Sequence, residues 1–267
     1  MKELYKRGIS GILYVTILLG TGLYTKIGFF SVLFVFSALA LFEFQRMQKY
    51  LSPIPILFLG LLYYQLFTDT LYPMISSGLL YVTLTVNSYL AIRIAVKKAI
   101  PIGPIQKSGF TYFYLMSSAF FIVATHTIES TIPMGITLLM YLLIWTNNSF
   151  AYLIGKRWGK HLLLPKVSPK KTWEGFLGGA LACLLVCIII AQFQSDYPLW
   201  VFFLLAILII KAATLGDLIE SQFKRQAHLK DSGSLLPGHG GFYDRMDSVL
   251  FTAPYVYLFF ILITYVS

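Results

Sequence analysis

Residues 198–218 read PLWVFFLLAILIIKAATLGDL, an apolar run that is interrupted by Lys211 and ends near Asp217. A helix of about 20 apolar residues crosses the hydrocarbon layer of a bilayer, so this run predicts a membrane-spanning helix. The composition agrees. Of the 267 residues, 57% are hydrophobic and 12% are charged, whereas soluble domains carry about 25% charged residues. We therefore treat residues 1–267 as a single membrane domain.

Comparable runs recur along the whole chain and predict an all-α, polytopic integral membrane protein with about nine transmembrane helices. The first two runs meet at a tight turn at Lys26, and the third run is shorter than the others. The expected spans are residues 8–25, 27–44, 53–68, 73–92, 109–126, 132–152, 173–192, 198–218 and 247–266.

The lysines and arginines indicate how these helices are oriented. Of the 21, 19 lie at the N-terminus or in even-numbered connections between spans, whereas the odd-numbered connections hold only Lys26. Basic residues accumulate on the cytoplasmic side of membrane proteins. We therefore expect a cytoplasmic N-terminus, an outside C-terminus and a basic face toward the cytoplasm in the cell membrane. Because the basic residues follow topology, nucleic-acid binding is disfavoured.

Acidic residues gather around one of these basic connections. Residues 215–248 read LGDLIESQFKRQAHLKDSGSLLPGHGGFYDRMDS. Asp217 and Glu220 share a face if the eighth helix continues, and Asp244 and Asp247 share a face at the start of the ninth. Carboxylates at a membrane edge are costly unless they are paired or bound to a cation. Aspartates from two helices therefore predict a Mg²⁺ site, since Mg²⁺ prefers oxygen ligands.

Phosphate-binding groups surround these acids. Lys and Arg bind phosphate as a point charge and as a bidentate partner, and the glycine-rich residues 237–241 let backbone N–H groups approach phosphate oxygens. The basic residues of this connection are Lys224, Arg225, Lys230 and Arg245. The simpler alternative is a loop closed by Asp–Arg salt bridges, with glycines that serve only the turns.

The order of these residues is specific. Residues 221–247 follow the pattern Ser-x-apolar-Lys-Arg, then Lys-Asp, then Pro-x-His-Gly-Gly, then Asp-Arg-x-Asp, and residues 168–175 read SPKKTWEG. Both stretches resemble the bacterial CDP-diacylglycerol synthase (phosphatidate cytidylyltransferase) family. The resemblance covers residues 148–267, the expected catalytic part, while residues 1–147, an N-terminal helical part, resemble the family only in hydropathy.

The resemblance implies a metal-dependent nucleotidyltransferase that converts CTP and phosphatidate to CDP-diacylglycerol and pyrophosphate in phospholipid biosynthesis. It implies Mg²⁺ with a second cation such as K⁺, held by Asp217 and Asp244 with Asp247 close by. The implied catalytic residues are Asp217, Asp244, Asp247, Lys224 and Arg225. The implied substrate-binding residues are Asn148, Ser168, Lys170, Lys171, Thr172, Ser221, Lys230, Asp231, His239, Gly240, Gly241 and Arg245.

Two residues carry open questions. Asn148 stands where the family often has Asp, so either a neutral ligand or ribose contact survives there or the position is a helix cap. Lys211 lies within an expected span about 9 Å along the helix before Asp217. It is read either as a counter-charge to the aspartates or as a lysine satisfied by water or carbonyl groups.

Two rival functions remain, one of them from another class. A CTP-dependent polyprenol or dolichol kinase would use similar groups but release CDP instead of pyrophosphate. A membrane transporter would also place charges inside the membrane, but it would be expected to show an internal repeat and broken helices, and neither is visible. The substrates imply partners in CTP, phosphatidate and membrane lipid, and a homodimer is left open.

Overall fold

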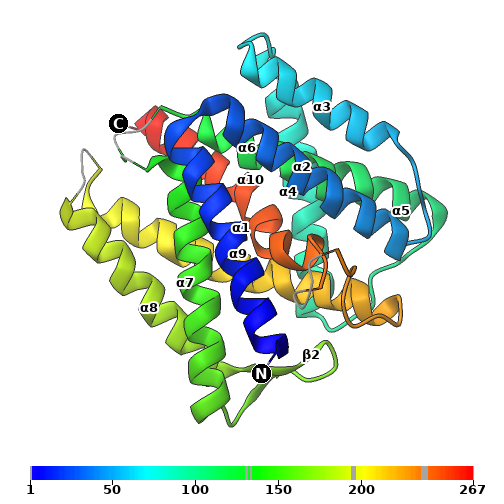
Figure 1. Ribbon diagram of the computed structural model, residues 1–267, viewed down its shortest axis with the longest axis vertical. Coiled ribbons are helices and arrows are strands. Elements are labelled where there is room, and N and C mark those ends of the chain that lie inside the picture. The colour runs from blue at the N-terminus through cyan, green and yellow to red at the C-terminus, as the bar shows by residue number, and fades with distance from the viewer. Residues whose placement is uncertain (1, 130–131, 133, 194–196, 236–239, 267) are drawn as a thin grey trace.

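The protein is a bundle of helices with one small hairpin (Figure 1). The computed structural model describes residues 2–129, 132, 134–193, 197–235 and 240–266. The helices are α1 (Lys2–Tyr24), α2 (Lys26–Met47), α3 (Ile54–Phe67), α4 (Pro73–Ala95), α5 (Pro104–Phe110), the π-helical segment η1 (Thr111–Met116), α6 (Ser117–His126), α7 (Gly135–Trp158), α8 (Trp173–Phe193), α9 (Leu199–Gln226) and α10 (Tyr243–Val266). The strands are β1 (Leu162–Leu164) and β2 (Ser168–Thr172).

Seven helices in the described part of the chain are long and apolar enough to cross a membrane. They are Lys26–Met47, Pro73–Ala95, Pro104–His126, Gly135–Trp158, Trp173–Phe193, Leu199–Gln226 and Tyr243–Tyr265. Shorter apolar helices at Gly11–Tyr24 and Ile54–Phe67 coincide with the other two expected spans. The largely helical, multi-pass architecture is therefore confirmed, while the count of nine and the orientation of the termini stay predictions.

The helices near the acidic connection are longer than the apolar runs that predicted them. The expected spans 132–152 and 198–218 are extended to Trp158 in α7 and to Gln226 in α9, and α10 begins at Tyr243, four residues before the expected span 247–266. Hydropathy marks only the apolar part of a helix, whereas hydrogen bonding continues into polar turns. As a result, the site acids lie on regular helix and not in loops.

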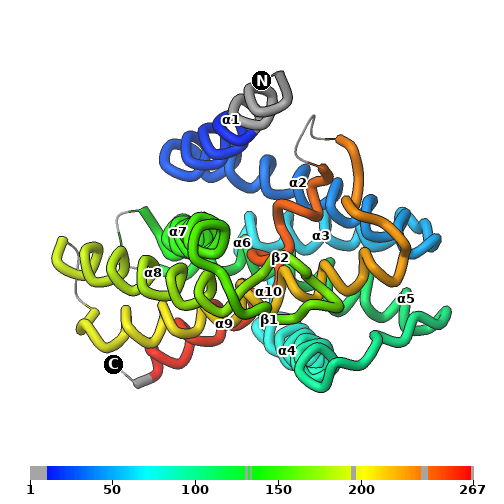
Figure 2. Tube along the Cα trace, turned by 90° about the horizontal axis from the view of Figure 1, so that it is seen from below, coloured from blue at the N-terminus to red at the C-terminus, as the bar shows by residue number. Residues whose placement is uncertain are grey.

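A β-hairpin interrupts the expected all-α fold between α7 and α8. Strands β1 and β2 pair antiparallel, with Leu162 opposite Thr172 and Leu164 opposite Ser168. Val167 in the turn between them is buried, and β2 contacts α7, α8 and α9. Seen from below, the hairpin lies across the end of these helices (Figure 2). The strands were not predicted because each is too short to show the two-residue period of a strand in the sequence.

Small residues set the spacing of the helices that carry the site. A Cβ atom on Gly175 of α8 would lie 2.6 Å from the carbonyl oxygen of Ala151 in α7. One on Gly216 of α9 would lie 2.8 Å from the carbonyl oxygen of Asp247 in α10. Glycines allow such close approach between membrane helices. The glycines therefore bring α7 against α8 and α9 against α10.

Helix α10 lies at the centre of the bundle, where it contacts α9, α6, α2, α4 and α7 (Figures 1 and 2).

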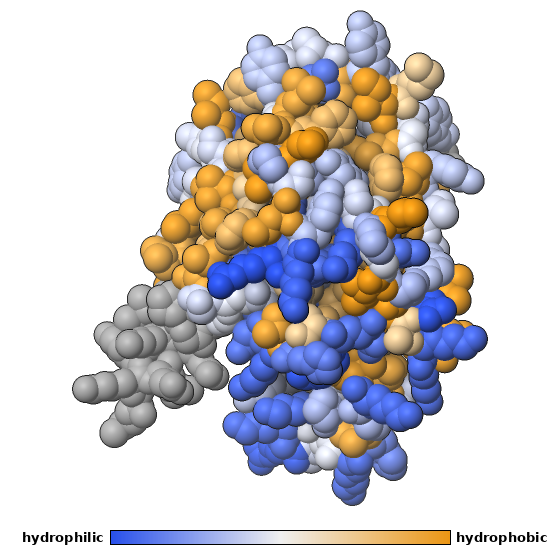
Figure 3. Space-filling view, turned by 90° about the vertical axis from the view of Figure 1, so that its right-hand side faces the viewer, coloured by the Kyte–Doolittle hydropathy of each residue, from blue (hydrophilic) through white to orange (hydrophobic). Residues whose placement is uncertain are grey.

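The outer surface is divided by polarity. Figure 3 shows hydrophobic side chains over the upper part of one face and hydrophilic side chains toward the lower end. Figure 1 places the hairpin at that lower end. This division is the one expected of a protein whose upper part lies in lipid and whose lower part meets water.

Candidate active site

Three carboxylates from two helices converge beside the glycine contact of α9 with α10. Asp217, Glu220 and Asp247 can each offer an oxygen that lies within 4.8 Å of the other two. We call these three residues the acid cluster. Glu220 and Asp247 are buried, with exposed fractions of 2% and 8%. An all-oxygen set with this much negative charge fits a hard divalent cation such as Mg²⁺.

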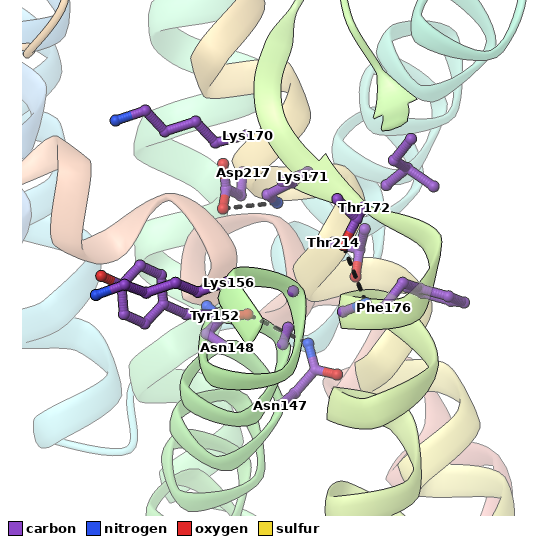
Figure 4. Close-up of a pocket in the computed structure, with 14 residues that line it drawn as sticks. Asn147, Asn148, Tyr152, Lys156, Lys170, Lys171, Thr172, Phe176, Thr214 and Asp217 are labelled. Carbon is purple, nitrogen blue, oxygen red and sulfur yellow. Dashed lines mark hydrogen bonds and ion pairs between the residues drawn. The ribbon is translucent and has the colours of Figure 1, made fainter. Parts of the chain in front are cut away.

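Two lysines neutralise part of this charge. The ammonium of Lys224 lies 2.6 Å from Glu220 and 2.8 Å from Asp244, so it joins α9 to α10. The ammonium of Lys171, on β2, lies 2.7 Å from a carboxylate oxygen of Asp217. Figure 4 shows the side chain of Lys171 turned toward Asp217, while that of Lys170 extends away. The acids and lysines together form a mixed-charge network, which suits a site that handles phosphate groups.

Asp244 shares Lys224 with Glu220 of the acid cluster and also binds the backbone of the loop after α9. Its Oδ1 accepts a hydrogen bond from Lys224, and its Oδ2 accepts from the backbone N–H groups of Ser232 and Gly241 at 2.9 and 2.7 Å. Gly240 adopts a φ of +83°, and a Cβ there would lie 2.6 Å from Asp244 Oδ2. Asp244 therefore holds the loop against α10. The structure brings Asp217 and Asp247 together, adds Glu220, and places Asp244 beside this group, where its carboxyl group meets that of Glu220 both directly and through Lys224.

A cavity of about 510 Å³ opens next to Asp217. Side chains from α7, the hairpin, α8 and α9 line it, and three of them are lysines (Figure 4). Its polar lining consists of Asn147, Asn148, Tyr152, Lys156, Lys170, Lys171, Thr172, Thr214 and Asp217. We call it the lysine cavity. A concave site with several cations and one acid at its end is suited to an anionic ligand.

A second cavity of about 510 Å³ lies along α1, α7 and α10 and is lined by Tyr14, Trp145, Asp244, Arg245 and Asp247. We call it the α1 cavity. Asn148 and Tyr152 line both cavities. Asp217 lines the first and Asp247 the second. The acid cluster is therefore bordered by two neighbouring cavities, an arrangement that can receive two ligands.

Asn148 lies inside α7, ten residues before the helix ends at Trp158. The helix-cap reading is therefore wrong. Its side-chain amide donates to Ser248 Oγ at 3.2 Å, and its Oδ1 accepts from Asn147 at 3.2 Å. A neutral amide thus links α7 to α10 next to Asp247, at the border of both cavities.

The other expected site residues have different surroundings. Thr172 lines the lysine cavity and accepts a hydrogen bond from Gly175 N–H at 3.1 Å, which caps α8. Ser221 donates to Asp217 at 3.3 Å. Three are exposed and line neither cavity: Arg225, Lys230 and Asp231. Ser168 begins β2, and His239 lies outside the described residues.

Lys211 does not supply the counter-charge to the aspartates. It is exposed on α9, and within the described part of the chain the ion pairs of the acids are made by Lys171 and Lys224. Sequence reasoning missed Lys156, Tyr152 and Thr214 as cavity residues, because only the packing of α7 on α8 and α9 shows where they face. It noted the spacing of Glu220 from Asp217 but did not name Glu220 as a ligand.

Comparison with known proteins shows similarity to one protein family. Residues 5–263 match the model of the cytidylyltransferase family. A phosphatidate cytidylyltransferase of Bacillus subtilis is 31% identical over 269 aligned residues, which cover 96% of this chain and 97% of the relative. A phosphatidate cytidylyltransferase of Staphylococcus saprophyticus is 34% identical over 254 residues, which cover 92% and 93%. The match to a Staphylococcus haemolyticus protein of the same name, 40% identical, covers 56% of this chain and 60% of the relative.

Proposed function

The chain belongs to the cytidylyltransferase family, and we propose that it converts CTP and phosphatidate to CDP-diacylglycerol and pyrophosphate in phospholipid synthesis. One observation carries the proposal within the site: the acid cluster borders two cavities, one of them lined by Lys156, Lys170 and Lys171. A nucleotide and a phospholipid each bring phosphate charge. Two spaces around one set of charged groups accommodate such a pair of ligands.

In this reaction an oxygen of the phosphatidate phosphate attacks the α-phosphorus of CTP. The new bond joins that oxygen to the α-phosphorus, the bond from the α-phosphorus to the bridging oxygen breaks, and pyrophosphate leaves. The second pKa of a phosphate monoester is about 6, so the attacking oxygen needs no strong general base at neutral pH. The main barrier is the approach of two anions, and positioned cations lower it.

The lysines are placed to lower this barrier. Lys156 and Lys170 reach the lysine cavity from α7 and β2, and Lys171 reaches it beside Asp217. Each supplies a positive charge to a phosphate oxygen without a change of fold. Lys224 is already paired with Glu220 and Asp244, so its role is to hold the two helices and balance their acids. Arg245, on the α1 cavity, is a further candidate phosphate contact.

Asp217, Glu220 and Asp247 would hold the divalent cation, and Asp244 stays a candidate ligand from the family resemblance. When bound, Mg²⁺ would withdraw charge from the phosphate oxygens and from the leaving pyrophosphate. A second cation such as K⁺ would share this role. The three clustered carboxylates support the proposal because a bound cation would add positive charge beside the buried acids Asp247 and Glu220, of which Glu220 already pairs with Lys224.

The proposed location is the cell membrane, with the site toward the cytoplasm. The basic residues of the even-numbered connections support this orientation. A site at the water-facing end of the helices lets the phospholipid arrive from the bilayer and the nucleotide from solution.

The deciding experiment incubates the purified protein in detergent with phosphatidate, radiolabelled CTP and Mg²⁺ and identifies the lipid product. CDP-diacylglycerol with an equal amount of pyrophosphate supports the proposal. A phosphorylated lipid alcohol with release of CDP, when polyprenol replaces phosphatidate, would instead identify a lipid kinase. Asp69→Asn serves as the control, since Asp69 is exposed in the connection between α3 and α4 and lines neither cavity.

A further inference from the structure

Glu43 is a buried carboxylate inside an apolar helix. It lies near the end of α2 with 2% of its surface exposed, and it is the one acidic residue between positions 4 and 68 of the sequence. Burying an ionisable side chain in such a helix is costly unless other groups satisfy it. The location and partners of Glu43 therefore need a physical explanation.

The partners of Glu43 come from the far end of the chain. Its Oε2 accepts hydrogen bonds from Ser232 Oγ and from the backbone N–H of Tyr243, both at 3.0 Å. Ser232 lies in the loop that follows α9, and Tyr243 is the first residue of α10. One side chain of the N-terminal half thus contacts both the loop that follows α9 and the first residue of α10.

The backbone of this loop is shaped around the Glu43 carboxylate. A Cβ atom on Gly233 or on Gly241 would overlap with the carboxylate oxygens of Glu43. Gly233 and Gly241 are not among the glycines with a positive φ, so backbone conformation does not require glycine at these positions. The close approach of Glu43 does require it. The two glycines let the loop close tightly on the carboxylate.

The same loop holds the acids of the site. Ser232 and Gly241 donate their backbone N–H groups to Asp244, so the loop lies between two carboxylates, Glu43 on one side and Asp244 on the other. Asp247 follows Asp244 by one helical turn of α10. The ring of Phe44 packs at 5.2 Å from both Phe223 of α9 and Tyr243 of α10. The end of α2 is therefore fixed against both helices that carry the acid cluster.

We propose that Glu43 is a positioning residue that fixes the loop after α9 and the first turn of α10, and thereby sets the place of Asp247 in the acid cluster. Glu43 lines neither the lysine cavity nor the α1 cavity, so it acts through Ser232, Tyr243 and the glycines and not by contact with a ligand. The effect on turnover rests on the proposed function. The effect on loop order does not.

The first test compares Glu43→Ala, Glu43→Gln and Gln45→Ala in the purified full-length protein. Gln45 is a matched control, because it is equally buried on α2 but accepts a hydrogen bond from Ser52 N–H, away from the site. Glu43→Ala should lower kcat by about 10- to 100-fold, with a change in KM below about threefold. Glu43→Gln keeps an acceptor oxygen and should recover most of the loss, and Gln45→Ala should leave kcat near wild type.

Hydrogen exchange of the peptide covering residues 227–247 gives a readout that does not depend on turnover. Glu43→Ala should speed exchange of this segment by about tenfold or more, while Gln45→Ala should not. Wild-type exchange and wild-type kcat in Glu43→Ala would overturn the proposal. A wild-type protein without CTP–phosphatidate turnover, but with faster exchange in Glu43→Ala, would reject the proposed function and leave the positioning role intact.

A double-mutant cycle tests the contact itself, and its single variant Gly233→Ala disturbs that contact in a protein that keeps Glu43. Gly233→Ala adds a Cβ that meets only atoms of Glu43 among its nearest neighbours. It should lower kcat by about fivefold or more in the wild-type background and have no further effect in the Glu43→Ala background. Equal losses in both backgrounds would show that the contact between Gly233 and Glu43 does not govern the site.

Discussion

The ammonium of Lys171 lies 2.7 Å from a carboxylate oxygen of Asp217, so the hairpin after α7 is joined to the acid cluster on α9. The same hairpin also lines the lysine cavity with Lys170 and Thr172. The contact between Lys171 and Asp217 holds a cation at the border between the lysine cavity and the three carboxylates. In the proposed reaction, Lys171 would exchange its carboxylate partner for a phosphate oxygen.

Lys171→Met should therefore lower kcat/KM for CTP by about 100-fold, because a positioned charge is lost at the reacting phosphates. Lys166→Met is the matched control: Lys166 is exposed on the same hairpin and lines neither cavity. Steady-state kinetics with radiolabelled CTP measure both variants. Equal kcat/KM values for the two variants would show that Lys171 does not act on the reacting phosphates.

Asp247→Asn and Glu220→Gln should each weaken Mg²⁺ binding and lower turnover by about 100-fold or more, because each removes a negative oxygen from the acid cluster. Binding of Mn²⁺ as a probe, followed by electron paramagnetic resonance, measures the first effect without substrate. Asp69→Asn should change neither. If both cluster variants bound Mn²⁺ as tightly as wild type, the acid cluster would not be the metal site.

Asp244→Asn and Asp217→Asn should separate two roles. The side chain of Asp244 is 6% exposed and pairs with Lys224, whereas that of Asp217 is 30% exposed. Breaking the buried pair should lower the free energy of unfolding by about 3 kcal/mol, so Asp244→Asn should reduce the thermal midpoint strongly. Asp217→Asn should abolish turnover but change the midpoint less. A smaller loss of stability in Asp244→Asn than in Asp217→Asn would contradict this division.

Gly216→Ala should reduce both activity and stability. The added Cβ would lie 2.8 Å from the carbonyl oxygen of Asp247 and 2.8 Å from Phe251 Cβ, so α9 and α10 would have to separate at the acid cluster. Overpacking of this kind costs about 1–3 kcal/mol. Gly78→Ala is the control, since nothing lies within 4 Å of a Cβ at that position of α4. Thermal unfolding in detergent and CTP turnover measure both variants, and an active, stable Gly216→Ala would refute the close contact.

Hydropathy was enough to place the helices, because the requirement for internal hydrogen bonding leaves helices as the solution for long apolar runs in lipid. Local spacing was enough to place Asp217 and Glu220 on one face of α9. It could not decide how α10 is rotated against α9. Asp244 and Asp247 are one turn apart, and only packing shows that Asp247 joins the acid cluster while Asp244 meets Lys224.

The features that escaped prediction depend on contacts between distant segments. Glu43 reaches Tyr243 across 200 residues of sequence, and no local pattern encodes such a pair. A signal was present nevertheless, since Glu43 is an acid inside the expected span 27–44, and charged residues inside spans are costly. The hairpin escaped because three-residue strands such as β1 lack a period long enough to read.

Asn148 and Tyr152 border both cavities, and this shared boundary has an energetic consequence. A molecule that filled one space would contact the same two side chains that an occupant of the other space would meet. The two affinities are then linked, and by thermodynamic reciprocity each ligand changes the binding of the other by the same factor. Cooperativity between the two ligands would arise here from a pair of side chains, with no movement of the helices.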